Sequence, residues 1–244
     1  MPDTPAPASP AEIAALIDHA ILKPELTHAE VDAELDLAER SRVFSVCVRP
    51  GDVAKAVARL EGTGVLVGTV IGFPHGTTST AAKVAESVTA LHEGARELDM
   101  VLHIGALRSG DLERVEADIR AVVATAAEQG ALVKGILETV FLTDDEVVAG
   151  AQAAERAGAA FVKTSTGFAG GGATPHHLRL MRDAVGPGVR IKASGGVRGL
   201  DTLLAMRELG VDRFGTSATA TILADAERLA TTGASAGMED VSSY

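Results

Sequence analysis

Eight short apolar runs alternate with longer amphipathic segments along this chain of 244 residues. Strands and helices in this rhythm form parallel sheets with helical crossovers, and eight repeats favour closure into a (β/α)8 TIM barrel. An open doubly wound sheet is the alternative, but no G-x-G-x-x-G sequence opens a helix after the first run. The runs that we predict as strands span residues 16–22, 43–48, 65–73, 97–104, 132–138, 161–166, 190–196 and 212–218.

The segments between these runs repeat their apolar residues at helical spacing. A glycine, the usual helix stop, follows the helical pattern at residues 94, 130, 158 and 210. We therefore expect a single barrel domain over residues 11–230, between a flexible N-terminal tail (1–10) and a flexible C-terminal tail (231–244). The predicted helices cover residues 29–41, 78–95, 112–130, 143–158, 174–186 and 199–210.

Charge and composition argue against several classes of function. The formal net charge of -11 provides no field to attract nucleic acid or an anionic membrane, and aromatic residues make up only 3% of the chain. The single cysteine, Cys47, excludes an internal disulfide and a multi-cysteine metal site. Because the opening MPDTPAPASP lacks the basic and apolar parts of a secretory signal, we expect a cytoplasmic protein without nucleic-acid or membrane partners.

Two lysines in neighbouring runs are the strongest chemical feature of the sequence. Side chains alternate along a strand, so Lys163 shares a face with Ser165, and Lys192 shares a face with Ser194. If these faces point into the barrel, the two lysines project from strands about 4.8 Å apart. At an effective dielectric near 20, two ammonium groups ~5 Å apart repel by about 3 to 4 kcal/mol, or roughly 2.5 pKa units. One lysine is therefore expected to be neutral, as a Schiff-base nucleophile must be, although the spacing leaves open which one.

The alternative for each lysine is an ordinary ion pair at the barrel rim, with Glu138 or Asp99 as the partner. For a single strand lysine this alternative is the better interpretation. Two such lysines on adjacent strands, each followed by hydroxyl residues and glycines, favour the reactive interpretation instead.

Acidic residues on the predicted strands have two compatible interpretations. Asp99 lies on the same strand face as Val101, where it is either the counter-ion of a lysine or a proton carrier for carbinolamine chemistry. Lys134 shares a strand face with Glu138, and we expect an internal ion pair between these two residues.

Glycine-containing turns follow the seventh and eighth predicted strands, in ASGGVRG (193–199) and FGTSA (214–218). Barrel enzymes often hold a phosphate at these two turns with backbone N–H groups. The turns explain how a chain of net charge -11 could bind an anionic ligand.

Together these motifs resemble those of the 2-deoxyribose-5-phosphate aldolases, a family of class I aldolases. The resemblance runs in the family's order through IDHAILKP, VIGFPHG, ELDMVLHIGALRSGD, FVKTSTGF, IKASGGVRGLDT and RFGTSA, and so covers nearly the whole chain. It implies reversible cleavage of 2-deoxy-D-ribose 5-phosphate to D-glyceraldehyde 3-phosphate and acetaldehyde, in deoxyribose phosphate catabolism. It implies no metal and no cofactor. Members are often dimers, so a homodimer is also expected.

The resemblance also implies roles for individual residues. Lys163 is the expected Schiff-base lysine, Lys192 the neighbour that lowers its pKa, and Asp99 the residue that assists proton transfer through water. Some members end in a tyrosine that reaches the site, as Tyr244 would here, although a tail that ends in tyrosine by chance is the alternative. The expected pocket residues are Asp18, Cys47, Lys134 and Thr166, and the expected phosphate site comprises Gly195, Gly196, Val197, Arg198, Gly215, Thr216 and Ser217.

Two positions depart from the family's pattern. Ala20 stands where members often have threonine, and His103 stands where many have asparagine, so substrate preference and rate follow less directly than the reaction type. We expect a structural role for His75, on a strand-to-helix loop, and a packing role for Cys47.

Two other functions are compatible with a phosphate-binding barrel. One is a different enzyme, such as an isomerase or another Schiff-base aldolase, and the other is a non-catalytic sugar-phosphate-binding barrel. The presence of Asp99, Lys163 and Lys192 together favours catalysis.

Overall fold

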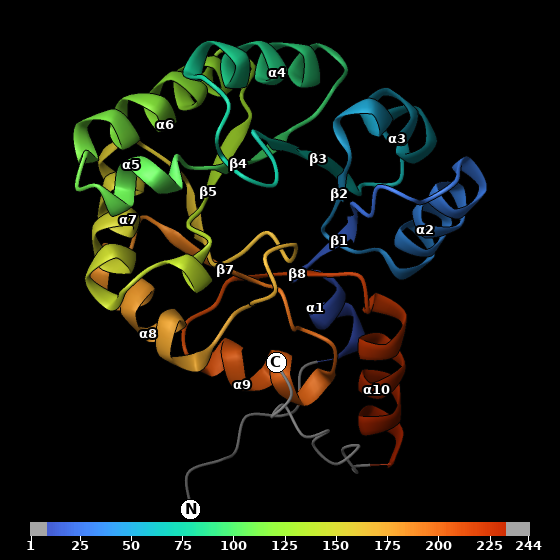
Figure 1. Ribbon diagram of the computed structural model, residues 1–244. Helices are drawn as coiled ribbons and strands as arrows, with labels where there is room; N and C mark the ends of the chain where they lie inside the picture. Colours follow the sequence, from blue (N-terminus) through green and yellow to red (C-terminus); the bar gives the residue numbers. More distant parts are fainter. Residues whose placement is uncertain (1–8, 233–244) are drawn as a thin grey trace, which may run out of the picture.

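Eight parallel strands close into a barrel in the computed structural model, which describes residues 9–232. Each strand pairs with the next in sequence, and β8 pairs with β1 to complete the circle (Figure 1). The (β/α)8 barrel predicted from the alternating runs is confirmed. The strands are β1 (Ile17–Ile21), β2 (Ser45–Val48), β3 (Leu66–Ile71), β4 (Glu97–Val101), β5 (Leu132–Ile136), β6 (Phe161–Lys163), β7 (Arg190–Ser194) and β8 (Arg213–Thr216).

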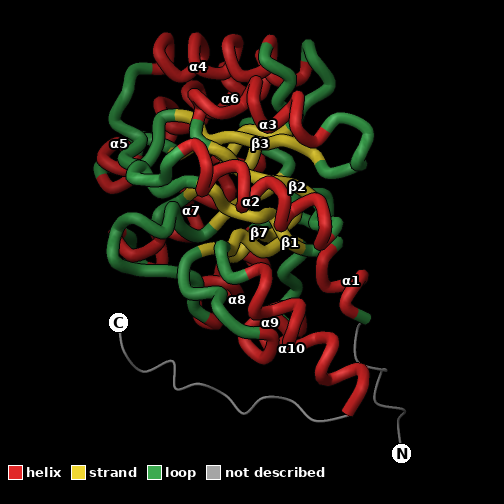
Figure 2. Tube along the Cα trace, turned by 90° about the vertical axis from the view of Figure 1, so that its right-hand side faces the viewer, coloured by secondary structure: helices red, strands yellow, loops and turns green. Residues whose placement is uncertain are grey.

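Helices surround the barrel and connect the ends of successive strands (Figures 1 and 2). They are α1 (Pro10–Ala14), α2 (His28–Ser41), α3 (Val53–Leu60), α4 (Thr80–His92), α5 (Ile104–Arg108), α6 (Leu112–Ala127), α7 (Asp144–Arg156), α8 (Pro175–Ala184), α9 (Leu200–Glu208) and α10 (Thr219–Thr232). Two short 3-10 turns, η1 (Pro50–Asp52) and η2 (Thr139–Phe141), follow β2 and β5.

Local sequence accounts for where the helices begin and end. Thr27 and Thr143 cap α2 and α7, and each accepts a hydrogen bond from the backbone of a glutamate three residues later, which also reaches back to the cap. The glycines at 94, 130, 158 and 210 all have positive φ, between 65° and 103°, as a chain leaving a helix requires. These glycines therefore separate helix from strand as the sequence predicted.

The hydrophobic core lies between the strands and the helices. Outward-facing strand residues such as Leu98, Val162 and Ile191 are fully buried there against apolar helix residues. The inward-facing side chains are different, because many of them carry charge. Barrel interiors are usually filled by branched aliphatic residues, so charged groups at this depth require partners of opposite charge.

Several elements differ from the prediction. β6 ends at Lys163 rather than at residue 166, because residues 164–168 leave the strand as an irregular segment with a bend at Gly167. The helices α1, α3, α5 and α10 were not predicted. The domain boundaries stay a prediction, with α1 beginning at Pro10 and α10 ending at Thr232.

Candidate active site

Lys163 and Lys192 stand directly opposite each other on β6 and β7. Both side chains are buried, and both ammonium groups donate to the same carboxylate oxygen, Asp99 Oδ2, at 2.6 and 2.8 Å. Lys192 has a second carboxylate, Asp18, at 2.5 Å. The predicted neighbourhood of the two lysines is therefore present, with Asp99 between them.

These contacts separate the two lysines electrostatically. Burial lowers the pKa of Lys163; Asp99 opposes this, and the charge of Lys192 lowers the pKa further. Burial would also lower the pKa of Lys192, but Asp18 and Asp99 outweigh it and raise that pKa above its usual value. Lys163 is thus the lysine that loses its proton more readily, a choice that the sequence left open. The sequence interpretation emphasised repulsion by Lys192, whereas burial is the larger cause.

Lys134 lies beneath this pair and joins three carboxylates. Its ammonium group contacts Asp18 at 2.9 Å, Glu97 at 2.6 Å and Asp99 at 3.1 Å. The ion pair expected between Lys134 and Glu138 is wrong. Glu138 lies beyond the end of β5 in a left-handed conformation, and its carboxylate accepts hydrogen bonds from a different residue, described below.

Asp99 and Asp18 are held in their charged form. Burial alone would raise the pKa of Asp99, but Lys134, Lys163 and Lys192 hold it well below its usual range. Asp18 behaves in the same way, because Lys134, Lys192 and Arg213 outweigh its burial. Asp99 is therefore a counter-ion to the lysines, one of the two interpretations of its place on the strand.

Sequence reasoning missed three members of the cluster, Ser45, Glu97 and Arg213. Arg213 donates to Asp18 at 2.5 Å, and Ser45 donates to both Asp18 and Glu97. Alternation along β4 could have found Glu97, because it shares a face with Asp99 two residues later.

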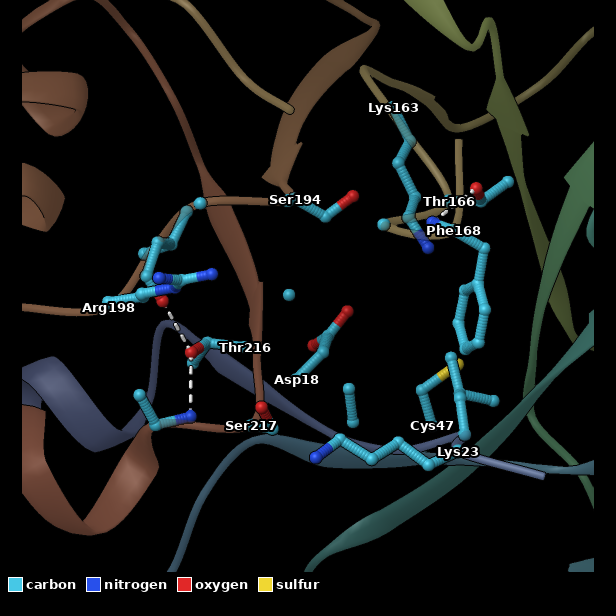
Figure 3. Close-up of a pocket in the computed structure, with 18 of the residues that line it drawn as sticks. Asp18, Lys23, Cys47, Lys163, Thr166, Phe168, Ser194, Arg198, Thr216 and Ser217 are labelled. Atoms are coloured by element: carbon cyan, nitrogen blue, oxygen red, sulfur yellow. Dashed lines mark hydrogen bonds between the residues drawn. The ribbon is translucent and has the colours of Figure 1, made fainter. Parts of the chain in front are cut away.

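A pocket with a volume of about 600 Å³ opens above the cluster at the carboxyl ends of the strands. Asp18, Cys47, Lys163 and Lys192 reach its surface, whereas Asp99 and Lys134 are not among the residues that line it. Figure 3 shows Lys163, Thr166 and Phe168 on one side of the pocket and Arg198 and Thr216 on the opposite side. A ligand in the pocket would therefore lie between the lysine and the glycine turns.

The glycine turns provide backbone donors on that opposite side. Gly195 and Gly196 have φ of 80° and 78°, which directs consecutive peptide groups around the pocket. Within residues 9–232, the backbone N–H groups of Gly196, Val197 and Ser217 donate to no protein acceptor. Free N–H groups beside Arg198 and the uncapped N-terminus of α9 form a site suited to an anion. All seven residues predicted for the phosphate site line the pocket: Gly195, Gly196, Val197, Arg198, Gly215, Thr216 and Ser217.

Lys23, Ser194 and Phe168 are among the pocket residues that were absent from the predicted site. Lys23, in the loop after β1, lies along the pocket, and Ser194 follows Lys192 on β7 (Figure 3). Phe168 lines the pocket and packs edge-to-face against Phe73, with ring centroids 5.3 Å apart. The alternation that places Lys192 inward also places Ser194 inward, whereas nothing local in the sequence identifies Lys23 or Phe168.

The remaining sequence candidates have modest roles in the geometry. Burial and Asp99 raise the pKa of the Cys47 thiol to about 11, which makes it unreactive. His103 caps α5 by accepting from the backbone of Ala106 at 3.1 Å, and Ala20 lines the pocket. His75 is exposed and is not among the pocket residues. Tyr244 lies outside the described residues.

No helix within residues 9–232 is both long and apolar enough to cross a bilayer.

Comparison with known proteins identifies the family. The model of the DeoC/LacD family aldolases matches residues 13–239. The deoxyribose-phosphate aldolase of Staphylococcus haemolyticus and deoxyribose-phosphate aldolase 2 of Staphylococcus aureus strain MRSA252 are each 51% identical over 205 residues, which cover 84% of this chain and 92% of theirs. Among solved structures, the tetrameric deoxyribose phosphate aldolase from Aeropyrum pernix is 32% identical, covers 91% of this chain and 93% of its own, and superimposes with a TM-score of 0.84. The chain therefore belongs to the DeoC/LacD aldolases, within the deoxyribose-phosphate aldolase family.

Proposed function

We propose that this protein cleaves 2-deoxy-D-ribose 5-phosphate reversibly into D-glyceraldehyde 3-phosphate and acetaldehyde through a Schiff base on Lys163. The observation that carries this assignment is the position of Lys163. Its ammonium group is buried, touches one shared carboxylate and opens onto a pocket whose far side is built for an anion. The family match at 51% identity supports the same reaction.

The open-chain form of the sugar would bind with its phosphate at the glycine turns. The N–H groups of Gly196, Val197 and Ser217, together with Arg198, would hold the phosphate and place the aldehyde carbon C1 near Lys163. Neutral Lys163 Nζ then attacks C1, and loss of water from the carbinolamine gives an iminium ion.

The iminium ion is the electron sink for bond cleavage. The C3 hydroxyl loses its proton, the C2–C3 bond breaks, and its electron pair forms an enamine between C2 and C1 while C3 becomes the aldehyde of glyceraldehyde 3-phosphate. Protonation of C2 and hydrolysis of the resulting iminium release acetaldehyde and free Lys163. We assign the proton transfers to water held by Asp99, and the stabilisation of neutral Lys163 before attack to the charge of Lys192.

Borohydride trapping tests this assignment directly. With acetaldehyde and borohydride, the reduced Schiff base should map to the peptide that contains Lys163, and label elsewhere would contradict the nucleophile. Cleavage of deoxyribose with and without its 5-phosphate should show a large preference for the phosphorylated sugar, because the anion site forms one side of the pocket.

The oligomeric state and the cellular location of the protein stay predictions. Self-association is supported by the tetrameric relative from Aeropyrum pernix, and light scattering of the purified chain would measure it. A cytoplasmic location is the second prediction, and fractionation of the cells that make the protein would test it.

A further inference from the structure

Glu138 has an unusual backbone for a residue with a side chain. Its φ of 56° and ψ of 63° lie in the left-handed region, and the residue stands two positions after the end of β5, at the pocket end of the barrel. For a residue other than glycine this conformation is unfavourable, and glycine would adopt it freely. A carboxylate at this position therefore points to a requirement for the side chain.

The side chain has one partner. Glu138 is buried, and within the described residues all of the hydrogen bonds to its side chain come from Thr166. The Thr166 backbone N–H donates to Oε1 and Oε2 at 3.3 and 3.2 Å, and the Thr166 hydroxyl donates to Oε2. Burial raises the pKa of Glu138, while these hydrogen bonds and the charge of Lys163 oppose that effect. Because the hydrogen bonds of this buried carboxylate all come from Thr166, Glu138 influences the site through the orientation of Thr166.

Thr166 faces the pocket three residues after Lys163 (Figure 3). A hydroxyl has one proton and two lone pairs. The proton of Thr166 is directed to Glu138, and one lone pair accepts from the Phe168 backbone N–H at 3.0 Å. What remains is one lone pair, so Thr166 can only accept a hydrogen bond from a bound molecule.

We propose that Glu138 is a positioning residue that fixes the Thr166 hydroxyl as a hydrogen-bond acceptor for a hydroxyl group of the sugar phosphate. This inference rests on the proposed function and adds a determinant of substrate choice. A hydroxyaldehyde phosphate satisfies the acceptor with an O–H group, whereas acetaldehyde has none. The acceptor therefore contributes to cleavage of the sugar and nothing to Schiff-base formation with acetaldehyde.

Two isosteric variants remove the acceptor in different ways. Glu138→Gln replaces the carboxylate with an amide that can donate to Thr166, so the threonine proton is freed toward the pocket. Thr166→Val removes the hydroxyl and keeps the shape of the side chain. We expect kcat/KM for 2-deoxyribose 5-phosphate to fall about 10- to 100-fold in each variant, as for a lost buried hydrogen bond. The rate of borohydride trapping of acetaldehyde at Lys163 should stay within about twofold of wild type.

Thr139→Val is the matched control. Thr139 adjoins Glu138, is buried, and its hydroxyl has no partner within the described residues. Thr139→Val replaces a hydroxyl with a methyl group beside Glu138, the same chemical change as in Thr166→Val. Both cleavage and trapping should therefore remain at the wild-type level.

The double variant Glu138→Gln/Thr166→Val should cleave no more slowly than Thr166→Val alone, because Glu138 acts through Thr166. Additive losses would overturn the inference, and so would unchanged cleavage in Glu138→Gln. Equal losses of cleavage and trapping would also overturn it, because they would show that Glu138 acts on Lys163. If Glu138→Gln does not fold, Thr166→Val still tests the acceptor itself, because unchanged cleavage in that variant would show that the Thr166 hydroxyl does not serve the sugar and would overturn the inference. Failure of the wild type to cleave the sugar phosphate overturns the proposed function itself, and is seen before any variant is made.

Discussion

Two buried lysines in this molecule show what distinguishes a structural lysine from a reactive one. Lys83, on α4, lies in the helix layer and donates to Asp118 at 2.5 Å and to the Val101 carbonyl at 2.9 Å. Lys163 lies inside the barrel and shares Asp99 with Lys134 and Lys192. Burial lowers the pKa of both Lys83 and Lys163. The direction of the pKa shift therefore does not separate them; the shared carboxylate and the open pocket do.

The largest effect is expected when the reactive lysine is removed. Lys163→Met should reduce retro-aldol activity at least about 10⁴-fold, because Lys192, the lysine beside it, is held protonated by Asp18 and Asp99 and is a poor nucleophile in that form. Asp99 keeps two lysine partners in this variant, so the thermal unfolding midpoint should change little. Steady-state cleavage and a melting curve measure the two quantities. Residual activity within tenfold of wild type would place the nucleophile elsewhere.

The next largest effect is expected at Lys192. Without this positive charge the protonated form of Lys163 becomes more favourable, so its pKa rises. Lys192→Met should reduce kcat/KM at pH 7 by about 100-fold and move the rising limb of the pH–rate profile to higher pH. Lys192→Arg keeps the charge and should keep the position of that limb, even if altered geometry slows the reaction. An unshifted profile in Lys192→Met would contradict coupling between the two lysines.

Removal of the structural lysine should affect stability and leave chemistry intact. Lys83→Met leaves Asp118 buried without its cation, which should decrease the free energy of unfolding by about 3 to 5 kcal/mol in a urea titration. The folded fraction should retain wild-type kcat/KM within about threefold. In the double variant Lys83→Met/Asp118→Leu, most of the lost stability should return. A large loss of activity in folded Lys83→Met would erase the distinction drawn between the two lysines.

The smallest effect on the reaction is expected from thiol reagents. The pKa of Cys47, about 11, leaves only about one thiol in a thousand ionised at pH 8. Iodoacetamide at pH 8 should therefore label the folded protein slowly and leave its activity unchanged. The labelling rate should rise about tenfold per pH unit toward pH 11, while unfolded protein should react at once. Rapid labelling of folded protein at pH 7 would show that burial and Asp99 do not hold the thiol in its neutral form.

The alternation of side chains along each strand predicted much of the site, because it depends only on residues that are close together in the sequence. Lys163 and Lys192 could be placed together from two adjacent strands and a parallel register. Of the three carboxylates that contact Lys134, Asp18 could not be placed in this way, since it reaches the lysine across the barrel from a strand 116 residues earlier. The glutamate that shares its strand in sequence, Glu138, was a natural but wrong choice.

Other misses have different physical causes. The left-handed backbone of Glu138 removes it from the strand face, and no neighbouring glycine or turn motif announces it. The larger influence of burial on Lys163 depends on how tightly its surroundings pack, which a pairwise estimate of repulsion omits. The helices α3 and α10 were not predicted, although the barrel that they complete was.

The contact between Asp18 and Arg213 joins the first strand to the last, 195 residues apart. During synthesis, Asp18 leaves the ribosome long before Lys192 and Arg213 exist, so the charge cluster has no complete form until the end of the chain arrives. Contacts of such sequence separation also form late and slowly when a full-length chain refolds. A nascent or truncated barrel therefore lacks the electrostatic arrangement that prepares Lys163, and carbonyl chemistry begins only once the ring has closed.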